Sequence, residues 1–171
     1  MAMGFPARLF SVILRVSPGR IRNWMWKWWY QRLAKAHHRS DFRFMNYGYK
    51  DDKGPKLSRE DEPNRLFIQL YHMNIRDIDL QGREVLEVGS GRGGGASWIA
   101  KYCEPESLVG VDFSKEAVRL SRKWYSEQEN LSFIEGNAES LPINDSACDV
   151  VYNVESSHCY GNMRAFAGEV N

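Results

Sequence analysis

EVLEVGSGRGGG, at residues 84–95, is the stretch of this sequence that decides its fold. The apolar run 84–88 lies between glycines and predicts a short buried strand, and the residues from Gly94 onward predict a helix. Gly89, Gly91 and Gly94 match the G-x-G-x-x-G pattern that joins such a strand to such a helix. Glycines there permit a tight turn and let a ligand approach the backbone closely. The stretch therefore predicts a loop that binds a nucleoside-type ligand.

Strands and helices alternate after this loop. Further strands are expected at 107–113, 131–135 and 149–154, and helices at 94–102, 114–129 and from about residue 162. This alternation predicts an α/β fold, a Rossmann-like doubly wound parallel sheet. Before the loop, acidic residues and Pro63 at 61–65 predict the start of a helix that ends before Asp77. Residues 41–62 are expected to be a loop.

Charge and aromatic residues divide the chain into three parts, at 1–40, 41–80 and 81–171. Residues 1–40 hold eight Arg or Lys residues and no Asp or Glu, on a chain with a formal net charge of +1. Trp24, Trp28 and Trp29 recur there at helical spacing, which predicts a basic, Trp-rich amphipathic helical arm. Two interpretations stay open: a helix that packs on the domain or covers a substrate pocket, and a peripheral membrane helix.

Composition excludes several classes of protein. The small net charge does not indicate a nucleic-acid partner. Cys103, Cys148 and Cys159 show no CxxC spacing, so neither a disulfide framework nor a metal site is expected. No apolar run approaches the ~20 residues that span a bilayer. We expect a cytoplasmic protein, with membrane contact through residues 1–40 as the alternative.

The residues around the glycine loop indicate which nucleoside ligand it takes. Asp112 ends the second predicted strand, where a carboxylate can accept both hydroxyls of a ribose, as in NAD and S-adenosylmethionine (SAM) alike. Glu87 lies two residues before Gly89. A carboxylate there suits the ammonium group of an aminoacyl ligand and does not suit a pyrophosphate. Glu87 therefore favours SAM over a dinucleotide.

Four segments carry a family resemblance. VLEVGSGRGG (85–94), VGVDFS (109–114), FIEGNAESLP (133–142) and CDVVYNVE (148–155) resemble the motifs of class I SAM-dependent methyltransferases. The resemblance covers about residues 82–171 and implies that the glycine loop holds the methionine moiety, Asp112 the ribose, and Asn137 and Ala138 the adenine. The cofactor-binding residues that it implies are Glu87, Gly89, Ser90, Gly91, Gly93, Gly94, Asp112, Phe113, Asn137, Ala138 and Asn153.

A closer likeness lies in DEPNR (61–65), QLYH (69–72), GGGAS (93–97) and NVESSHCY (153–160). These segments resemble the phthiotriol/phenolphthiotriol dimycocerosates methyltransferases and, more distantly, the sterol methyltransferases. The resemblance runs from about residue 20 to the end and implies O-methylation of a hydroxyl on a small-molecule or lipid-like substrate.

Two residues after the fourth predicted strand are candidates for removing the acceptor's proton. His158 follows that strand at the carboxyl edge of the sheet, where ligands bind, and histidine is the commonest general base. Glu155 is the second candidate. Each has a structural alternative, in which His158 orders the loop or binds substrate and Glu155 positions SAM or the loop. Tyr47, Tyr49 and Tyr71 are expected either to line a lid over SAM or to pack in the core.

The family sheet has the strand order 3-2-1-4-5-7-6, and only four strands are predicted in this sequence. We therefore expect a sheet truncated after strand 4. The alternative function is a non-catalytic, truncated SAM-binding fragment that associates with a membrane or a partner. An NAD-dependent oxidoreductase is a third hypothesis.

Overall fold

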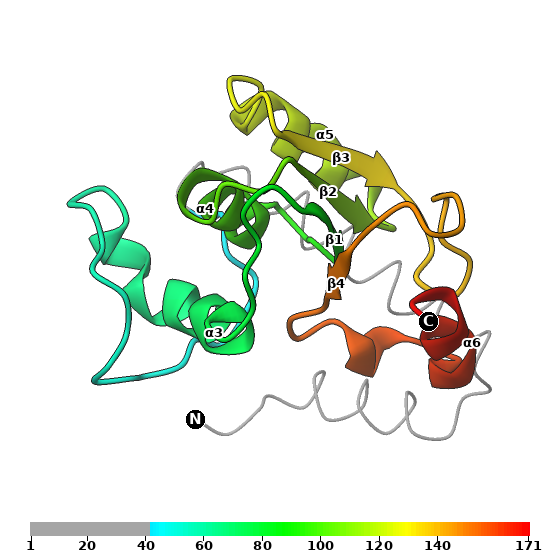
Figure 1. The fold of residues 1–171 in the computed structure, drawn as a ribbon, viewed down its shortest axis with the longest axis horizontal. Helices are drawn as coiled ribbons and strands as arrows, with labels where there is room; N and C mark the ends of the chain where they lie inside the picture. Colours follow the sequence, from blue (N-terminus) through cyan, green and yellow to red (C-terminus); the bar gives the residue numbers. More distant parts are fainter. Residues whose placement is uncertain (1–41) are drawn as a thin grey trace, which may run out of the picture.

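A computed structural model of the protein describes residues 42–171. The predicted helical arm at 1–40, with both of its interpretations, lies outside these residues. The helices and strands, labelled as in Figure 1, are η1 (Glu62–Asn64), α3 (Arg65–Ile75), β1 (Glu84–Val88), α4 (Gly94–Tyr102), β2 (Ser107–Asp112), α5 (Lys115–Trp124), β3 (Leu131–Glu135), β4 (Val150–Tyr152), η2 (Ser157–Cys159) and α6 (Met163–Glu169).

The four strands form one parallel sheet in the order β3-β2-β1-β4. The connections from β1 through α4 to β2, and from β2 through α5 to β3, move outward in one direction. The chain then returns to the other side of β1 to form β4. This order confirms the predicted Rossmann-like fold. The reversal at β1 and β4 is a topological switch point, where ligands bind in open α/β sheets.

Side chains of successive strand residues point to opposite faces of the sheet, and each face has its own core. Val85 of β1 packs in a cluster with residues of α3, α4 and α5, whereas Leu86 and Val88 pack in a second cluster with Phe166 of α6. Figure 1 shows α3 and α4 on one side of the strands and α6 on the other. Alternation therefore directs Glu87, like Val85, toward α3 and α4.

The element boundaries agree with the predictions except in three elements, β2, β4 and α5. Strands β1 and β3 and helix α4 have the predicted bounds, and Ser114 caps α5 by accepting a hydrogen bond from the backbone N–H of Ala117. Strand β2 ends one residue early, at Asp112, and β4 is shorter than predicted. Helix α5 ends at Trp124 instead of Glu129, because the backbone N–H of Gln128 turns back to the carbonyl of Tyr125.

The segment before the sheet joins the same core. Residues 42–61 contain no helix or strand, as predicted, and Phe44 is buried with residues of α3. Tyr49 N–H donates to the carbonyl of Leu66, which fixes this segment along α3. The three-part division of the chain stays a prediction. Among residues 42–171, no helix has the length and apolar character needed to cross a bilayer.

Candidate active site

The glycine loop is fastened to the end of β2. The backbone N–H groups of Gly89 and Ser90 both donate to the carbonyl of Val111, at 2.7 and 3.0 Å. Gly89 has φ +80°, and a Cβ there would lie 2.2 Å from the Ser156 hydroxyl. Glycine is therefore required at this position both by the backbone conformation and by the close approach of the turn after β4.

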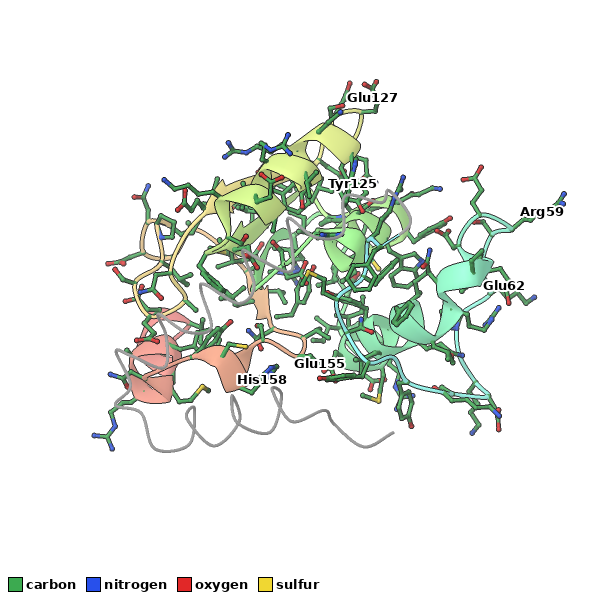
Figure 2. The ribbon with its side chains drawn as sticks, turned by 180° about the vertical axis from the view of Figure 1, so that it is seen from behind. Arg59, Glu62, Tyr125, Glu127, Glu155 and His158 are labelled. Carbon is green, nitrogen blue, oxygen red and sulfur yellow. The ribbon has the colours of Figure 1, made fainter. Side chains whose placement is uncertain are left out.

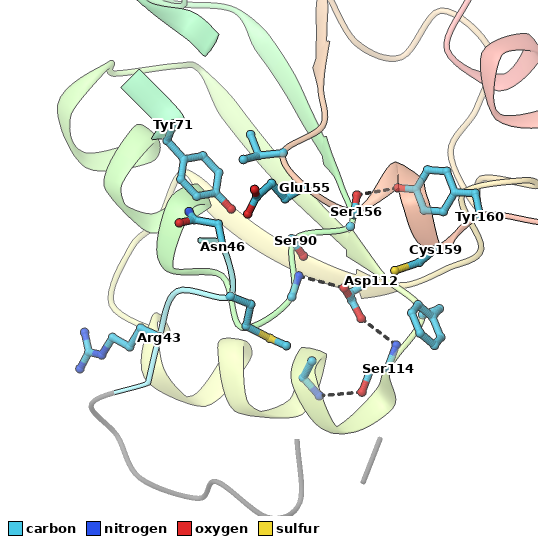
Figure 3. A pocket seen from close by; sticks show the side chains of 16 residues that line it. Arg43, Asn46, Tyr71, Ser90, Asp112, Ser114, Glu155, Ser156, Cys159 and Tyr160 are labelled. Carbon is cyan, nitrogen blue, oxygen red and sulfur yellow. Dashed lines mark hydrogen bonds between the residues drawn. The ribbon is translucent and has the colours of Figure 1, made fainter. Parts of the chain in front are cut away.

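Asp112 connects this loop to helix α5. Its carboxylate is 8% exposed and accepts hydrogen bonds from the backbone N–H groups of Gly91 and Ser114, both at 2.8 Å (Figure 3). Burial raises the pKa of Asp112 to about 6, and the two N–H donors offset part of that rise. A carboxylate has about four acceptor positions. Two therefore remain for the hydroxyls of a ligand.

A cavity opens over this loop at the carboxyl ends of the strands (Figure 3). It is lined by Arg43, Met45, Asn46, Tyr71, Gly89, Ser90, Gly91, Asp112, Phe113, Ser114, Ala117, Val154, Glu155, Ser156, Cys159 and Tyr160. Ser90 is 4% exposed, and its hydroxyl has no hydrogen-bond partner within the described structure. That oxygen is buried and lies toward Gly110 of β2, so Ser90 meets the cavity through other atoms.

Six of the residues predicted to act in binding or catalysis line this cavity and form part of its wall: Gly89, Ser90, Gly91, Asp112, Phe113 and Glu155.

Four other predicted cofactor residues lie outside this wall. Gly93 faces the ring of Phe133, and the backbone of Gly94 lies against the Arg43 carbonyl. Ala138 is buried in the cluster around α6. Asn137 is exposed, and its side chain accepts a hydrogen bond from the backbone N–H of Glu139. Their predicted contact with a cofactor stays a prediction.

Asn153 organises the turn after β4 from outside the cavity. Its Nδ2 group lies 2.8 Å from the carbonyl of Val88, 2.6 Å from the Ser156 hydroxyl and 2.7 Å from the Tyr160 hydroxyl. The Ser156 and Tyr160 hydroxyls are also hydrogen-bonded to each other, at 2.8 Å. Asn153 thus sets the positions of two residues that line the cavity.

The two candidate bases occupy different places. Glu155 lines the cavity and accepts a hydrogen bond from the backbone N–H of Tyr47 at 2.6 Å. His158 lies in η2, is exposed, and is not among the residues that line the cavity. Figure 2 shows both side chains on the turn that follows β4. The geometry therefore places Glu155, and not His158, at the cavity.

Glu87 lies behind the cavity wall. It is fully buried and absent from the lining residues. Its Oε1 accepts from the Tyr71 hydroxyl at 2.9 Å, and its Oε2 accepts from the Tyr152 hydroxyl at 3.1 Å. Burial raises the pKa of Glu87 to about 7, although the hydrogen bonds from Tyr71 and Tyr152 oppose this rise.

The residues that the sequence did not identify come mainly from the segment before α3, the start of α5 and the turn after β4. Met45 lies over the loop, with its sulfur 3.2 Å from where a Cβ on Gly91 would be. Asn46 donates from Nδ2 to the carbonyl of Phe67 at 3.2 Å, which holds the segment in place. No hydrophobic period marks this segment; the aromatic and glycine residues at 47–49 were its only signal. Of the three predicted lid tyrosines, Tyr71 lines the cavity.

Comparison with known proteins decides the family of this site. A family model described as a methyltransferase domain matches residues 86–171. The chain belongs to this methyltransferase family. The match begins inside β1 and contains the glycine loop, Asp112 and the turn after β4. Among residues 42–171, no group of three or more His, Cys, Asp or Glu side chains could hold a metal ion.

Two curated methyltransferases are similar to this chain over most of its length. The phthiotriol/phenolphthiotriol dimycocerosates methyltransferase of Mycobacterium tuberculosis is 37% identical over 166 residues, covering 96% of this chain and 61% of its own. The fatty-acid O-methyltransferase of Mycolicibacterium smegmatis is 42% identical over 143 residues, covering 82% of this chain and 52% of its own. The chain thus spans about three fifths, or less, of the length of these relatives.

Solved structures agree on the fold of this chain. The geranyl diphosphate C-methyltransferase of Streptomyces coelicolor superposes with a TM-score of 0.64 at 18% identity, covering 82% of this chain and 58% of its own. The YcgJ protein of Bacillus subtilis superposes with a TM-score of 0.55 at 29% identity, covering 59% of this chain and 44% of its own.

Proposed function

We propose that this protein binds SAM in the cavity over the glycine loop and transfers its methyl group to an oxygen of a lipid-like acceptor. A hydroxyl oxygen is the preferred acceptor. The observation that carries the proposal is the convergence of the glycine loop and the buried Asp112 carboxylate on one cavity. The names of the phthiotriol dimycocerosates and fatty-acid methyltransferases support a lipid-like acceptor. The family match favours this function over an NAD-dependent oxidoreductase.

The residues of the cavity fit the parts of SAM. Asp112 has acceptor positions for the ribose hydroxyls, and the glycine loop can lie against the aminoacyl end. Phe113, Ala117 and Val154 supply apolar surface for the adenine. When bound, SAM supplies an electrophilic methyl group on a sulfonium. The protein's contribution is then to hold donor and acceptor in line, and such orientation can supply roughly 7–11 kcal/mol of the barrier.

An alcohol acceptor must also lose its proton. Glu155 supports this role better than His158 does, because its carboxylate lines the cavity. A well-placed general base contributes typically ~10²–10⁴-fold to the rate. The hydrogen bond from Tyr47 N–H holds Glu155 in place, and Glu155 has φ +52°, a conformation that non-glycine residues rarely adopt.

Transfer of radiolabelled methyl from SAM to a long-chain alcohol and to a long-chain fatty acid tests the proposal. We expect label in the organic phase with one of these acceptors. With the alcohol as acceptor, Glu155→Gln should lower kcat by ~10²-fold or more and leave SAM affinity unchanged, since the Gln carbonyl can still accept from Tyr47. A fatty acid is already ionised at neutral pH and needs no base. A comparable loss of kcat in His158→Gln would instead assign the role of general base to His158. SAM binding without transfer would support the non-catalytic alternative instead.

The family and the sequence also support two proposals on location. We propose that the protein is cytoplasmic, where Cys103, Cys148 and Cys159 remain free thiols. We propose further that the basic, Trp-rich residues 1–40 make peripheral contact with anionic membranes, where a lipid-like acceptor would be found. Co-sedimentation of the whole protein with anionic and with neutral liposomes tests this contact; equal pelleting with both, or none, would contradict it.

A further inference from the structure

Tyr71 brings helix α3 into contact with the strand that carries the glycine loop. The side chain is 6% exposed, it lines the cavity, and Figure 3 shows its ring directed toward the middle of that cavity. A Cβ on Gly95 would lie 1.9 Å from the Tyr71 ring, so the ring rests directly on the backbone of α4. The third glycine of the GGG run therefore admits Tyr71 and does not contact the ligand.

The Tyr71 hydroxyl is the polar contact between the cavity and the Glu87 carboxylate. Glu87 does not line the cavity, whereas Tyr71 lines it and donates to Glu87 at 2.9 Å. A phenol oxygen that donates one hydrogen bond can still accept others. A cationic group that binds the Tyr71 oxygen would therefore be linked to the buried carboxylate through a two-bond chain.

We propose that Tyr71 is a positioning residue that relays the negative charge of Glu87 to the ammonium group at the aminoacyl end of the cofactor. The inference rests on the proposed function, because it requires SAM in this cavity. It replaces direct contact between Glu87 and the ligand with contact through Tyr71. The Tyr152 hydroxyl holds the other carboxylate oxygen from β4, outside the cavity wall.

The groups around the hydrogen-bonded pair of Tyr71 and Glu87 make ligand affinity depend on pH if the relay exists. Glu87 faces the hydroxyls of Tyr71 and Tyr152, the backbone N–H of Ala96 and the carboxylate of Asp112. Tyr71 is in turn influenced by Glu155 and Tyr125, and Tyr152 by Cys103. Because burial raises the pKa of Glu87 to about 7, its charge changes within the pH range of a binding assay. A bound ammonium favours the ionised carboxylate.

Calorimetric titration with S-adenosylhomocysteine between pH 6 and 8 is the test, since this ligand keeps the aminoacyl end. Affinity of the natural protein should rise about tenfold over this range, because only the ionised fraction of Glu87 contributes. With 5′-methylthioadenosine, which lacks the aminoacyl end but keeps the ribose, the rise should shrink to about twofold, because only the ionisation of Asp112 remains. Tyr71→Phe should bind near the low-pH affinity throughout, with no more than this twofold rise.

Tyr152→Phe is the matched control. It removes an equivalent donor to Glu87 from a residue that does not line the cavity, so it should keep the tenfold rise with a midpoint at higher pH. Two results for Tyr71→Phe would overturn the inference. A loss of affinity by the same factor at every pH would indicate a purely structural role. A rise in affinity of the same size, with only its midpoint moved to another pH, would indicate direct contact between Glu87 and the ligand. If the natural protein binds neither ligand, the proposed function itself fails, and this inference with it.

Discussion

Replacing Glu87 with glutamine should stabilise the ligand-free protein at alkaline pH. Glutamine has nearly the shape of glutamate, and its amide can remain hydrogen-bonded to the hydroxyls of Tyr71 and Tyr152. It does not carry the charge that the fully buried side chain otherwise acquires. The cost of that charge is visible in the pKa of Glu87, which burial raises from 4.5 to about 7.

The sign follows from proton binding. Below pH 4.5 Glu87 is neutral in the folded and the unfolded chain, so it contributes no pH dependence. Between pH 4.5 and about 7 the unfolded chain releases its proton while the folded protein retains it, so the free energy of unfolding falls as pH rises. At 1.36 kcal/mol per tenfold change, the total loss is about 3 kcal/mol and is complete near pH 8. The free energy of unfolding of Glu87→Gln does not undergo this loss, because the glutamine side chain does not ionise.

Urea unfolding at pH 5 and pH 8 measures the effect. From pH 5 to pH 8, the free energy of unfolding of the natural protein should fall by about 2.5 kcal/mol relative to that of Glu87→Gln, since part of the total loss has already occurred at pH 5. The control is Glu84→Gln, at the exposed start of the same strand, which should change stability by less than about 0.5 kcal/mol at either pH. A difference for Glu87→Gln that is the same at both pH values would refute the reasoning.

Three further substitutions test the site and the packing that supports it. Asp112→Asn should weaken S-adenosylhomocysteine binding about 10- to 100-fold in calorimetry, since charge-assisted hydrogen bonds are worth roughly 1.5–3 kcal/mol; Asp145→Asn, in an exposed turn, should bind as the natural protein does. Gly95→Ala should cost about 1–3 kcal/mol in urea unfolding because its Cβ would overlap the Tyr71 ring. Gly168→Ala in α6, with no atom within 4 Å of the new Cβ, should be neutral or slightly stabilising. Phe133→Ala should cost about 3–5 kcal/mol, since the ring is 3% exposed in the core; a loss below 1 kcal/mol would contradict that packing.

The strands could be predicted because their signals are local. Residues 84–88 and 131–135 are short apolar runs between turn residues, and both strands have the predicted bounds. The end of α5 could not be predicted in this way. The residues after Trp124 include Glu and Gln, which favour helix. At this end Tyr125 is buried against Phe133, with ring centroids 5.9 Å apart, and this contact depends on the folded sheet.

In the candidate site, too, local features could be predicted from the sequence and tertiary contacts could not. The glycine loop and Asp112 come from one strand–loop–helix unit and from the end of the neighbouring strand, so their convergence follows from a parallel sheet. The place of Glu87 behind the wall depends on how α3 packs on α4, and Tyr71 is 16 residues away in the sequence. Met45 over Gly91 depends on a segment without periodic signal. Contacts of this kind are set by tertiary packing and leave no local pattern.

A crystal structure of the protein with S-adenosylhomocysteine tests the central claim most directly. Our account predicts the ribose hydroxyls within hydrogen-bonding distance of the Asp112 carboxylate, the aminoacyl end beside the glycine loop and Ser90, and the Met45 side chain moved from its position over Gly91. The ammonium group should contact the Tyr71 oxygen. A ligand bound elsewhere, or with its ribose away from Asp112, would contradict the account.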